Sequence, residues 1–141
     1  MNGFYDYFPK LIQYMEKHNP KYIFEYGVGM SSIVLAKLYP DSRIYSIEYS
    51  FKWYLINEFV RILRGAHNLT IAYIPNKQKF IEYHLDYRTK YDFYILDSPE
   101  DYGERKEILS ILRKLRVPIL IHDAKKVIGA KQNTMVVNNH N

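Results

Sequence analysis

The strongest constraint on this sequence is a regular alternation of short apolar runs with longer segments of helical spacing. The segments between the runs carry apolar residues every three or four positions, as on one face of a helix. Such an alternation predicts right-handed crossovers and a mostly parallel sheet with helices on both faces. The predicted fold class is therefore α/β, with a single doubly wound sheet. The five runs predicted as strands are Tyr22–Tyr26, Arg43–Ile47, Leu69–Ile74, Phe93–Leu96 and Pro118–Ile121.

Turn and capping residues set the bounds of the expected helices. Asn19-Pro20 ends the first helix, Ser50 is a good cap for the third, Gly65 ends it, and Asn76 can cap the fourth. One more helix and a last strand at Thr134–Val137, expected at an antiparallel edge, complete the chain. The expected helices cover residues 4–18, 31–39, 51–64, 77–87 and 102–115.

A chain of 141 residues is one domain's worth and can bury a core without disulfides. We divide it into an N-terminal helix (1–19), a cofactor-binding core (20–123) and a short C-terminal helix and strand (124–141). It has no cysteine, which excludes disulfides, thiolate zinc sites and a cysteine nucleophile. The start lacks the features of a signal peptide and no apolar run approaches about 18 residues. We therefore expect a cytoplasmic protein without a membrane span.

The net charge of +5 comes from Lys and Arg scattered over several segments. We interpret these residues mainly as solvated helix faces, and keep an anionic partner such as a nucleic acid as the alternative. Fifteen tyrosines, no cysteine and abundant Ile, Lys and Arg make the composition similar to that of heat-adapted proteins.

Polar residues follow each predicted strand, at the edge of the sheet where α/β proteins bind ligands. They are Glu25, Glu48, Asn76, Asp97, and His122 with Asp123.

The most informative segment is the first turn, where Gly27-Val28-Gly29 leads from a strand into a helix beginning at Ser31 or Ser32. Glycines allow a tight turn and a close approach of backbone to a ligand, and a helix start offers free N–H groups. Glu48 lies 21 residues after Gly27, a spacing used to bind ribose hydroxyls. Together they predict a site for a nucleotide-like cofactor.

The same residues resemble the class I S-adenosylmethionine-dependent methyltransferases. Glu25-x-Gly27-x-Gly29-x-Ser31 is similar to the first motif of that family, with serine in the last glycine position. Ser-Ile-Glu48 resembles the second motif, and the segment from Tyr91 to Pro99 resembles the fourth. The resemblance covers nearly the whole chain in order.

The resemblance implies roles for individual residues. Glu25, Gly27, Gly29 and Ser31 would form the turn at the methionine part of S-adenosylmethionine. Glu48 would bind the ribose, Tyr49 would lie against adenine, Asn76 would be near the adenine edge, and Asp97 would sit beside the methyl donor. Carboxylates suit a cationic sulfonium and would repel the pyrophosphate of NAD.

For the reaction, the resemblance favours methylation of oxygen. Asp97 and Asp123 match two metal ligands of metal-assisted O-methyltransferases, but Ala124 stands where that family has asparagine. We therefore expect no metal as the main interpretation, and keep a divalent metal ion at Asp97 and Asp123 as the alternative. Without a metal, Asp97 or His122 can act as the base, with Asp123 as a further catalytic candidate. His18, His67, His84 and His140 lack metal-ligand spacing, and Trp53 and the helical tyrosines are expected in the core.

Several alternatives stay open. The family usually has a longer C-terminal part, so we expect a minimal enzyme, a subunit that borrows surface from a partner such as a second copy, or a relative that only binds. The methyl acceptor, small or macromolecular, is not identified. The competing functions are a non-catalytic nucleotide- or nucleic-acid-binding module and an NAD-linked oxidoreductase.

Overall fold

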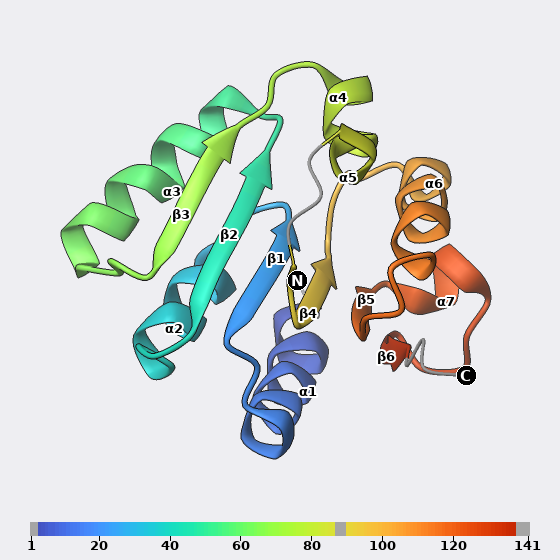
Figure 1. Ribbon diagram of the computed structural model, residues 1–141, viewed down its shortest axis with the longest axis horizontal. Coiled ribbons are helices and arrows are strands. Elements are labelled where there is room, and N and C mark those ends of the chain that lie inside the picture. The colour runs from blue at the N-terminus through green and yellow to red at the C-terminus, as the bar shows by residue number, and fades with distance from the viewer. Residues whose placement is uncertain (1–2, 87–89, 138–141) are drawn as a thin grey trace.

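The computed structural model describes residues 3–86 and 90–137, which form a single six-stranded sheet in the order β3-β2-β1-β4-β5-β6 (Figure 1). The first five strands run parallel, and β6 pairs with β5 in the antiparallel direction. The predicted α/β class and the antiparallel edge are therefore confirmed. The strands are β1 (Tyr22–Tyr26), β2 (Arg43–Glu48), β3 (Leu69–Tyr73), β4 (Phe93–Leu96), β5 (Ile119–His122) and β6 (Thr134–Val137).

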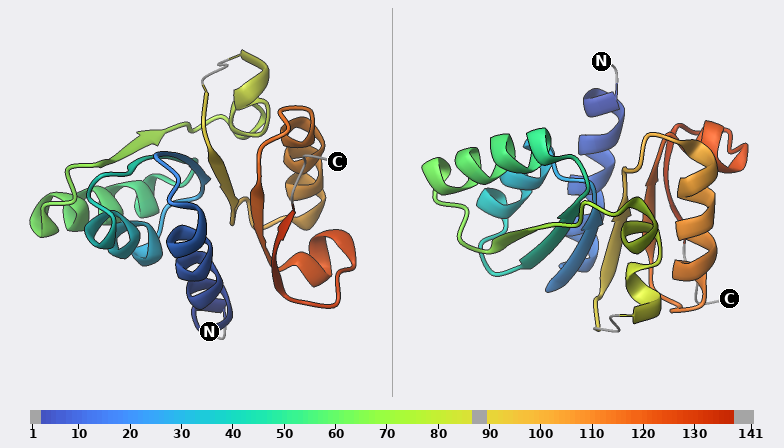
Figure 2. Two further views of the ribbon diagram at one scale, coloured as in Figure 1. Left: turned by 60° about the horizontal axis from the view of Figure 1, so that its bottom comes forward. Right: turned by 90° about the horizontal axis from the view of Figure 1, so that it is seen from above.

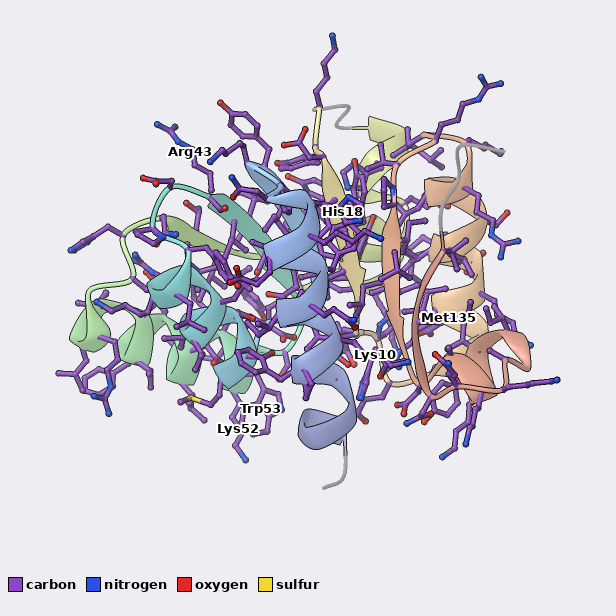
Figure 3. The ribbon with its side chains drawn as sticks, turned by 90° about the horizontal axis from the view of Figure 1, so that it is seen from below. Lys10, His18, Arg43, Lys52, Trp53 and Met135 are labelled. Carbon is purple, nitrogen blue, oxygen red and sulfur yellow. The ribbon has the colours of Figure 1, made fainter. Side chains whose placement is uncertain are left out.

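Helices cover both faces of the sheet (Figure 2). One face carries α1 (Gly3–His18), α2 (Met30–Leu38) and α3 (Phe51–Arg64). The other carries α4 (Lys77–Ile81), α5 (Tyr83–Asp86), α6 (Tyr102–Arg113) and α7 (Ala124–Ile128). Figure 3 shows Lys10 reaching from α1 toward β6, where its Nζ donates to the carbonyl of Thr134 at 2.8 Å.

The strand residues alternate between the two layers because successive side chains of a strand point to opposite faces. Ile23 packs in the cluster beneath α1 and α2, whereas Phe24 and Tyr26 pack beneath α4 and α6. All three side chains are fully buried. The continuous apolar character of the predicted strands thus has the expected cause, a sheet covered on both sides.

Capping residues act as predicted. The Ser50 hydroxyl accepts from the backbone N–H of Trp53, Gly65 ends α3 in the left-handed region, and the Asn76 side chain accepts from the N–H of Lys79. One helix differs from its prediction, because the expected helix over 77–87 is broken at Glu82 into α4 and α5. The predictions that fall on Tyr87, His140 and the rest of 138–141 lie outside the described residues.

The prediction that Trp53 packs in the core is wrong, because half of its surface is exposed. Figure 3 shows Lys52 and Trp53 extending outward from α3. The apolar residues of α3 do have helical spacing, but many of them point away from the sheet.

Within the described ranges no helix has both the length and the apolarity needed to cross a membrane.

Candidate functional site

A cleft of about 330 Å³ opens at the carboxyl edge of the sheet, between the strands where the order reverses. β1 and β4 are neighbours there, and the chain leaves them in opposite directions, so their following loops diverge and leave a crevice. The volume is within the usual range for a small-molecule site. The lining residues are Gly27, Val28, Gly29, Met30, Glu48, Tyr49, Ser50, Trp53, Ile56, Asn57, Asp97, Ser98 and Glu100.

Gly27 lets the first turn pass against the loop after β4. Its φ of +89° lies in the region that favours glycine, and a Cβ at this position would come within 2.4 Å of the Ser98 Cβ. At Gly29, in contrast, a Cβ would meet no atom within 4 Å. The two glycines therefore differ in role, since Gly27 is required by packing and Gly29 leaves open space at the cleft.

Glu48 joins the two loops that form one side of the cleft. Its Oε1 accepts from the N–H of Val28 at 3.3 Å, and its Oε2 accepts from the N–H of Ser50 at 2.9 Å. Burial raises the pKa of the carboxyl above its usual range, and the backbone hydrogen bonds oppose that rise. A carboxylate can accept about four hydrogen bonds, so Glu48 retains capacity for a ligand hydroxyl.

Glu25 lies beneath the cleft rather than on its wall. Its Oε1 accepts hydrogen bonds from the hydroxyls of Ser32 and Ser46, which ties β1 to α2 and β2. Burial raises the pKa of Glu25 to about 7, against the effect of those two hydrogen bonds, and nearby Asp97 and Glu48 raise it further. The geometry gives Glu25 an internal role in supporting the turn.

Asp97 and His122 form a hydrogen-bonded pair between the ends of β4 and β5. Asp97 Oδ1 and His122 Nδ1 are 2.5 Å apart. Burial lowers the pKa of His122, but the hydrogen bond and charge of Asp97 and the charge of Asp123 outweigh this and raise it overall. His122 Nε2 is buried without a hydrogen-bond partner among the described residues, next to the ring of Tyr7 at 5.0 Å between centroids. Asp97 is therefore the member of the pair that faces the cleft.

Arg105, on α6, holds the loop after β4 against the end of β5. Its Nε donates to the carbonyl of Pro99 at 2.6 Å, and its Nη2 donates to the carbonyl of Asp97 at 2.8 Å. Its Nη1 donates to the carbonyl of His122 at 3.2 Å and lies 3.5 Å from Asp123 Oδ2. Only 5% of Arg105 is exposed, so these acceptors satisfy a buried cation.

Asp123 is enclosed by donors from three directions. Besides Arg105, the hydroxyl of Tyr102 lies 3.4 Å from Oδ2 and the amide of Asn133 donates to Oδ1 at 3.3 Å. The backbone of Asp123 has a φ of +57°, an uncommon conformation outside glycine. Asp123 was predicted in the catalytic set, but it is not among the residues that line the cleft, and its Oδ2 lies 3.8 Å from His122 Nδ1.

These contacts do not fit a divalent metal ion. Asp97 is hydrogen-bonded to His122, and Asp123 forms an ion pair with the guanidinium of Arg105. Both carboxylates therefore already have partners that a metal ion would have to displace. Within 3–86 and 90–137, no group of three acidic or imidazole side chains is arranged to bind a metal. We therefore assign no chemistry to a metal.

The remaining predicted cofactor residues divide into two groups. Gly29 and Tyr49 line the cleft, and the Tyr49 ring packs edge-on against Phe80. Ser31 lies in the first turn of α2 with its side chain toward Tyr7, and Asn76 caps α4, so neither lines the cleft.

Sequence reasoning missed Arg105 and the apolar wall formed by Met30, Trp53 and Ile56. The wall had a signal, since α3 directly follows Glu48 and its first turns must lie beside that carboxylate. No signal in the sequence indicated the role of Arg105. An arginine on a predicted helix is usually solvated, and the acceptors of this one come from three separate segments of the chain.

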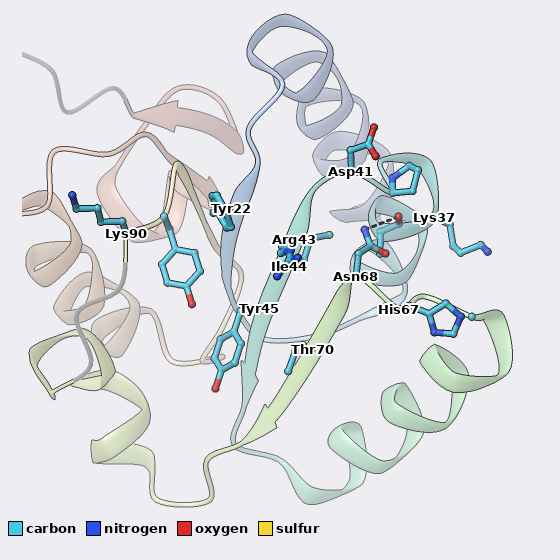
Figure 4. Close-up of a pocket in the computed structure, with 14 residues that line it drawn as sticks. Tyr22, Lys37, Asp41, Arg43, Ile44, Tyr45, His67, Asn68, Thr70 and Lys90 are labelled. Carbon is cyan, nitrogen blue, oxygen red and sulfur yellow. Dashed lines mark hydrogen bonds between the residues drawn. The ribbon is translucent and has the colours of Figure 1, made fainter.

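A larger hollow of about 900 Å³ lies at the opposite edge of the sheet (Figure 4). It is lined by residues near the amino ends of the first strands, including Tyr22, Arg43 and Thr70. Ligands of open α/β sheets bind at the carboxyl ends, so the smaller cleft at Gly27 and Glu48 is the candidate site.

No protein-family model matches the sequence, and a search of curated proteins finds no match. Several solved structures are similar in fold. A candidate O-methyltransferase from Klebsiella pneumoniae has a TM-score of 0.69 at 17% identity, covering 84% of this chain and 56% of that one. A candidate caffeoyl-CoA O-methyltransferase from Staphylococcus aureus has a TM-score of 0.66 at 20% identity, covering 84% of this chain and 57% of the other.

A third similar structure is the O-methyltransferase TomG from Streptomyces achromogenes, solved in complex with S-adenosylmethionine. Its TM-score is 0.65 at 20% identity, covering 81% of this chain and 53% of TomG. The chain thus spans a little over half the length of these three proteins. Together with the strand order and the glycine turn, these likenesses show that the chain has the Rossmann-like methyltransferase fold.

Proposed function

We propose that this chain binds S-adenosylmethionine in the cleft at Gly27 and Glu48 and transfers its methyl group to an oxygen atom of an acceptor. The observation that carries the proposal is the charge of the cleft. Its described lining includes three carboxylates, those of Glu48, Asp97 and Glu100, and no lysine, arginine or histidine. A cationic sulfonium is favoured in such surroundings, whereas a pyrophosphate is repelled.

The lining also offers a suitable place for each part of the cofactor. Glu48 has free acceptor capacity for the two ribose hydroxyls, and Tyr49, Trp53 and Ile56 provide apolar surface beside it for the adenine ring. The open space at Gly29 is available for the methionine part. In TomG, which has the same fold, S-adenosylmethionine is bound.

The cofactor, when bound, supplies a methyl group on a positively charged sulfur. The protein must then align an acceptor hydroxyl and remove its proton. Asp97 is the group that faces the cleft and can accept this proton, while His122 orients the Asp97 carboxylate through the 2.5 Å hydrogen bond. We assign the base to Asp97 because the second nitrogen of His122 is buried.

The two alternatives from the sequence have weaker support. An NAD-linked reaction would place a pyrophosphate against three carboxylates. A nucleic-acid-binding module is motivated by the net charge of +5, but the cleft itself is acidic. Because the sequence lacks cysteine, which suits a reducing compartment, we propose the cytoplasm as the location.

Ligand binding tests the proposal directly. S-adenosylhomocysteine should raise the melting temperature of the protein, and NAD should not, because a ligand that binds the folded state stabilises it by mass action. Calorimetry should show that Glu48→Gln weakens S-adenosylhomocysteine binding by about tenfold or more, equivalent to roughly 1.4 kcal/mol. Glu107→Gln, at an exposed position on α6, is the matched control and should bind as wild type does. Stabilisation by NAD alone would reject the proposal.

Catalysis is tested separately. With radiolabelled S-adenosylmethionine and a panel of phenols, catechols and hydroxy acids, wild type should label at least one acceptor. Asp97→Asn should lose turnover by about a hundredfold or more while retaining S-adenosylhomocysteine binding, since a general base typically contributes 10²–10⁴-fold. Unchanged turnover in Asp97→Asn would show that another group removes the proton.

A further inference from the structure

The outer face of α3 is the most unusual surface of the described chain. Phe59 and Leu63 are 67% and 68% exposed, although single helices of folded domains normally turn such residues toward the core. Together with their neighbours they form a continuous apolar surface, which we call the α3 face. Its seven members are Phe51, Trp53, Leu55, Ile56, Phe59, Ile62 and Leu63.

The inner side of α3 is only partly apolar, because Tyr54 and Val60 pack against the core while polar residues lie beside them. Asn57 is 3% exposed, and its side-chain amide donates to the carbonyl of Trp53 at 2.8 Å. Glu58 and Arg61 are partly buried and pair with each other. The helix is therefore amphipathic with much of its apolar side toward solvent, which the packing of this chain alone does not explain. Large exposed apolar patches mark interaction sites.

The arrangement of the α3 face fits another helix. Phe51, Leu55, Phe59 and Leu63 are spaced four residues apart, whereas Trp53, Ile56, Phe59 and Ile62 are spaced three apart. Rows with these two spacings are the ridges that fit into the grooves of a facing helix. The two rows cross at Phe59, near the middle of the exposed surface.

The size of the face fits a stable protein interface. Half-exposed side chains of this size present on the order of 100 Å² each, so the seven together offer roughly 700 Å². A standard interface buries about 800 Å² on each partner. Trp53 and Ile56 also line the cleft, and the other five members offer roughly 500 Å², which is more than half of what a stable pair needs.

The charges around the face favour a protein over a lipid surface. On α3, Arg61 is neutralised by Glu58, which leaves Lys52 and Arg64 as its remaining basic residues. Lipid-binding segments typically carry clusters of four to eight Lys and Arg. A surface that is mainly apolar and bears few charges of one sign can instead meet its own copy.

We infer that the α3 face binds a second copy of this chain, with the two α3 helices crossing at Phe59 about a two-fold axis. A two-fold interface uses the same patch on both partners, so each Phe59 lies close to the other. This inference is independent of the proposed function. Trp53 and Ile56 belong to both the face and the cleft, so the test uses Phe59, which lines only the face.

Sedimentation measures the proposed association. Wild type should sediment as a dimer over a concentration series from about 1 to 100 μM, and Phe59→Asp should sediment as a monomer, with its dissociation constant raised at least a hundredfold. Phe59 is exposed, so the variant should keep the wild-type circular dichroism spectrum. Leu38→Asp replaces an exposed leucine at the end of α2 and should leave the dimer intact.

Cross-linking tests the position of the axis. The chain has no cysteine, so Phe59→Cys provides a single thiol. Under mild oxidation it should form a covalent dimer rapidly, whereas Leu38→Cys should not, because only the first lies near the axis. The inference is overturned if wild type is monomeric at 100 μM. It is equally overturned if the monomer binds anionic phosphatidylserine vesicles through Phe59, or if both thiols cross-link at the same rate.

Discussion

The two halves of the cleft are built in different ways. On the side of β1 and β2, glycines and backbone N–H groups arrange the turn around the Glu48 carboxylate. On the side of β4 and β5, the buried guanidinium of Arg105 gathers three backbone carbonyls and the carboxylate of Asp123. An anion organises the first half and a cation organises the second.

The difference separates binding from catalysis. The first half contains groups that can hold a nucleoside, and its geometry depends on short segments of chain. The second half contains Asp97, whose position depends on contacts between distant elements, namely α6 and the ends of β4 and β5. A change of Glu48 should therefore act on affinity, whereas a change of Arg105 or Asp97 should act on stability or on proton transfer.

The largest effect is expected from Arg105→Met. The substitution keeps an unbranched side chain but leaves the carbonyls of Pro99 and Asp97 without their donor and Asp123 without its counter-ion. Loss of one partner from a buried ion pair destabilises by about 3–5 kcal/mol. Urea denaturation should show this loss, and Arg113→Met, exposed on the same helix, should change the free energy of unfolding by less than about 0.5 kcal/mol. Equal effects of the two substitutions would contradict the organising role of Arg105.

The next effect is expected from Gly27→Ala on the opposite side of the cleft. The new Cβ would meet the Ser98 Cβ, and the positive φ adds strain. Overpacking and strain together should lower the free energy of unfolding by about 3 kcal/mol. Gly29→Ala is the matched control, because its Cβ has open space and its backbone is extended, and it should change stability by less than about 1 kcal/mol. If the two variants were equally stable, the close approach of the two loops would be wrong.

The fold could be predicted from the sequence because its signals are local. β1, β4 and β6 have the predicted bounds, and Ser50 and Gly65 mark the ends of α3 as expected. The break at Glu82 could not be predicted, because the flanking residues 77–87 have no helix-breaking glycine or proline. It depends on how α4 and α5 pack against the rest of the domain.

The first half of the candidate site could be predicted from the sequence, and so could Asp97 and His122 of the second half, but not the arginine that holds that half together. Gly27, Gly29 and Glu48 follow from the order of strand, turn and helix, and the structure brings them together with Asp97. Their contacts with a cofactor stay predictions. The role of Arg105 depends on long-range contacts, and the outward turn of α3 depends on which helix face the sheet leaves uncovered. Neither is encoded in a local pattern.

Glu25→Gln should change how stability depends on pH. The carboxyl is titrated near pH 7 in the folded chain, against 4.5 for the unperturbed group. The folded state thus binds the proton more tightly, and the stability from this group is full below pH 4.5 and is lost as pH rises through about 7. Wild type should lose up to about 3 kcal/mol over this range relative to Glu25→Gln, whose amide does not titrate. Denaturation series at several pH values measure the difference.

The same experiment also separates Glu25 from its neighbours. Glu48 and His122 titrate in both proteins, so their contributions cancel in the comparison apart from the interaction between Glu25 and Glu48. Ser46→Ala, which removes one donor to Glu25, should raise the pKa of the carboxyl further and move the loss of stability to higher pH. Parallel pH profiles of wild type and Glu25→Gln would show that the carboxyl does not titrate in this range.

The smallest effect is expected at the helix caps, which also differ between the two halves. The Asp101 carboxylate caps α6, the helix of Arg105, and accepts from the N–H of Glu104 at 3.1 Å, whereas the Ser50 hydroxyl caps α3 through a bond of 3.5 Å. Asp101 combines the shorter bond with a negative charge at the positive end of the helix. Asp101→Ala should lower the free energy of unfolding by about 1 kcal/mol and Ser50→Ala by about half as much. A larger loss in Ser50→Ala would mean that the first half, rather than the Arg105 half, depends more on how its helix begins.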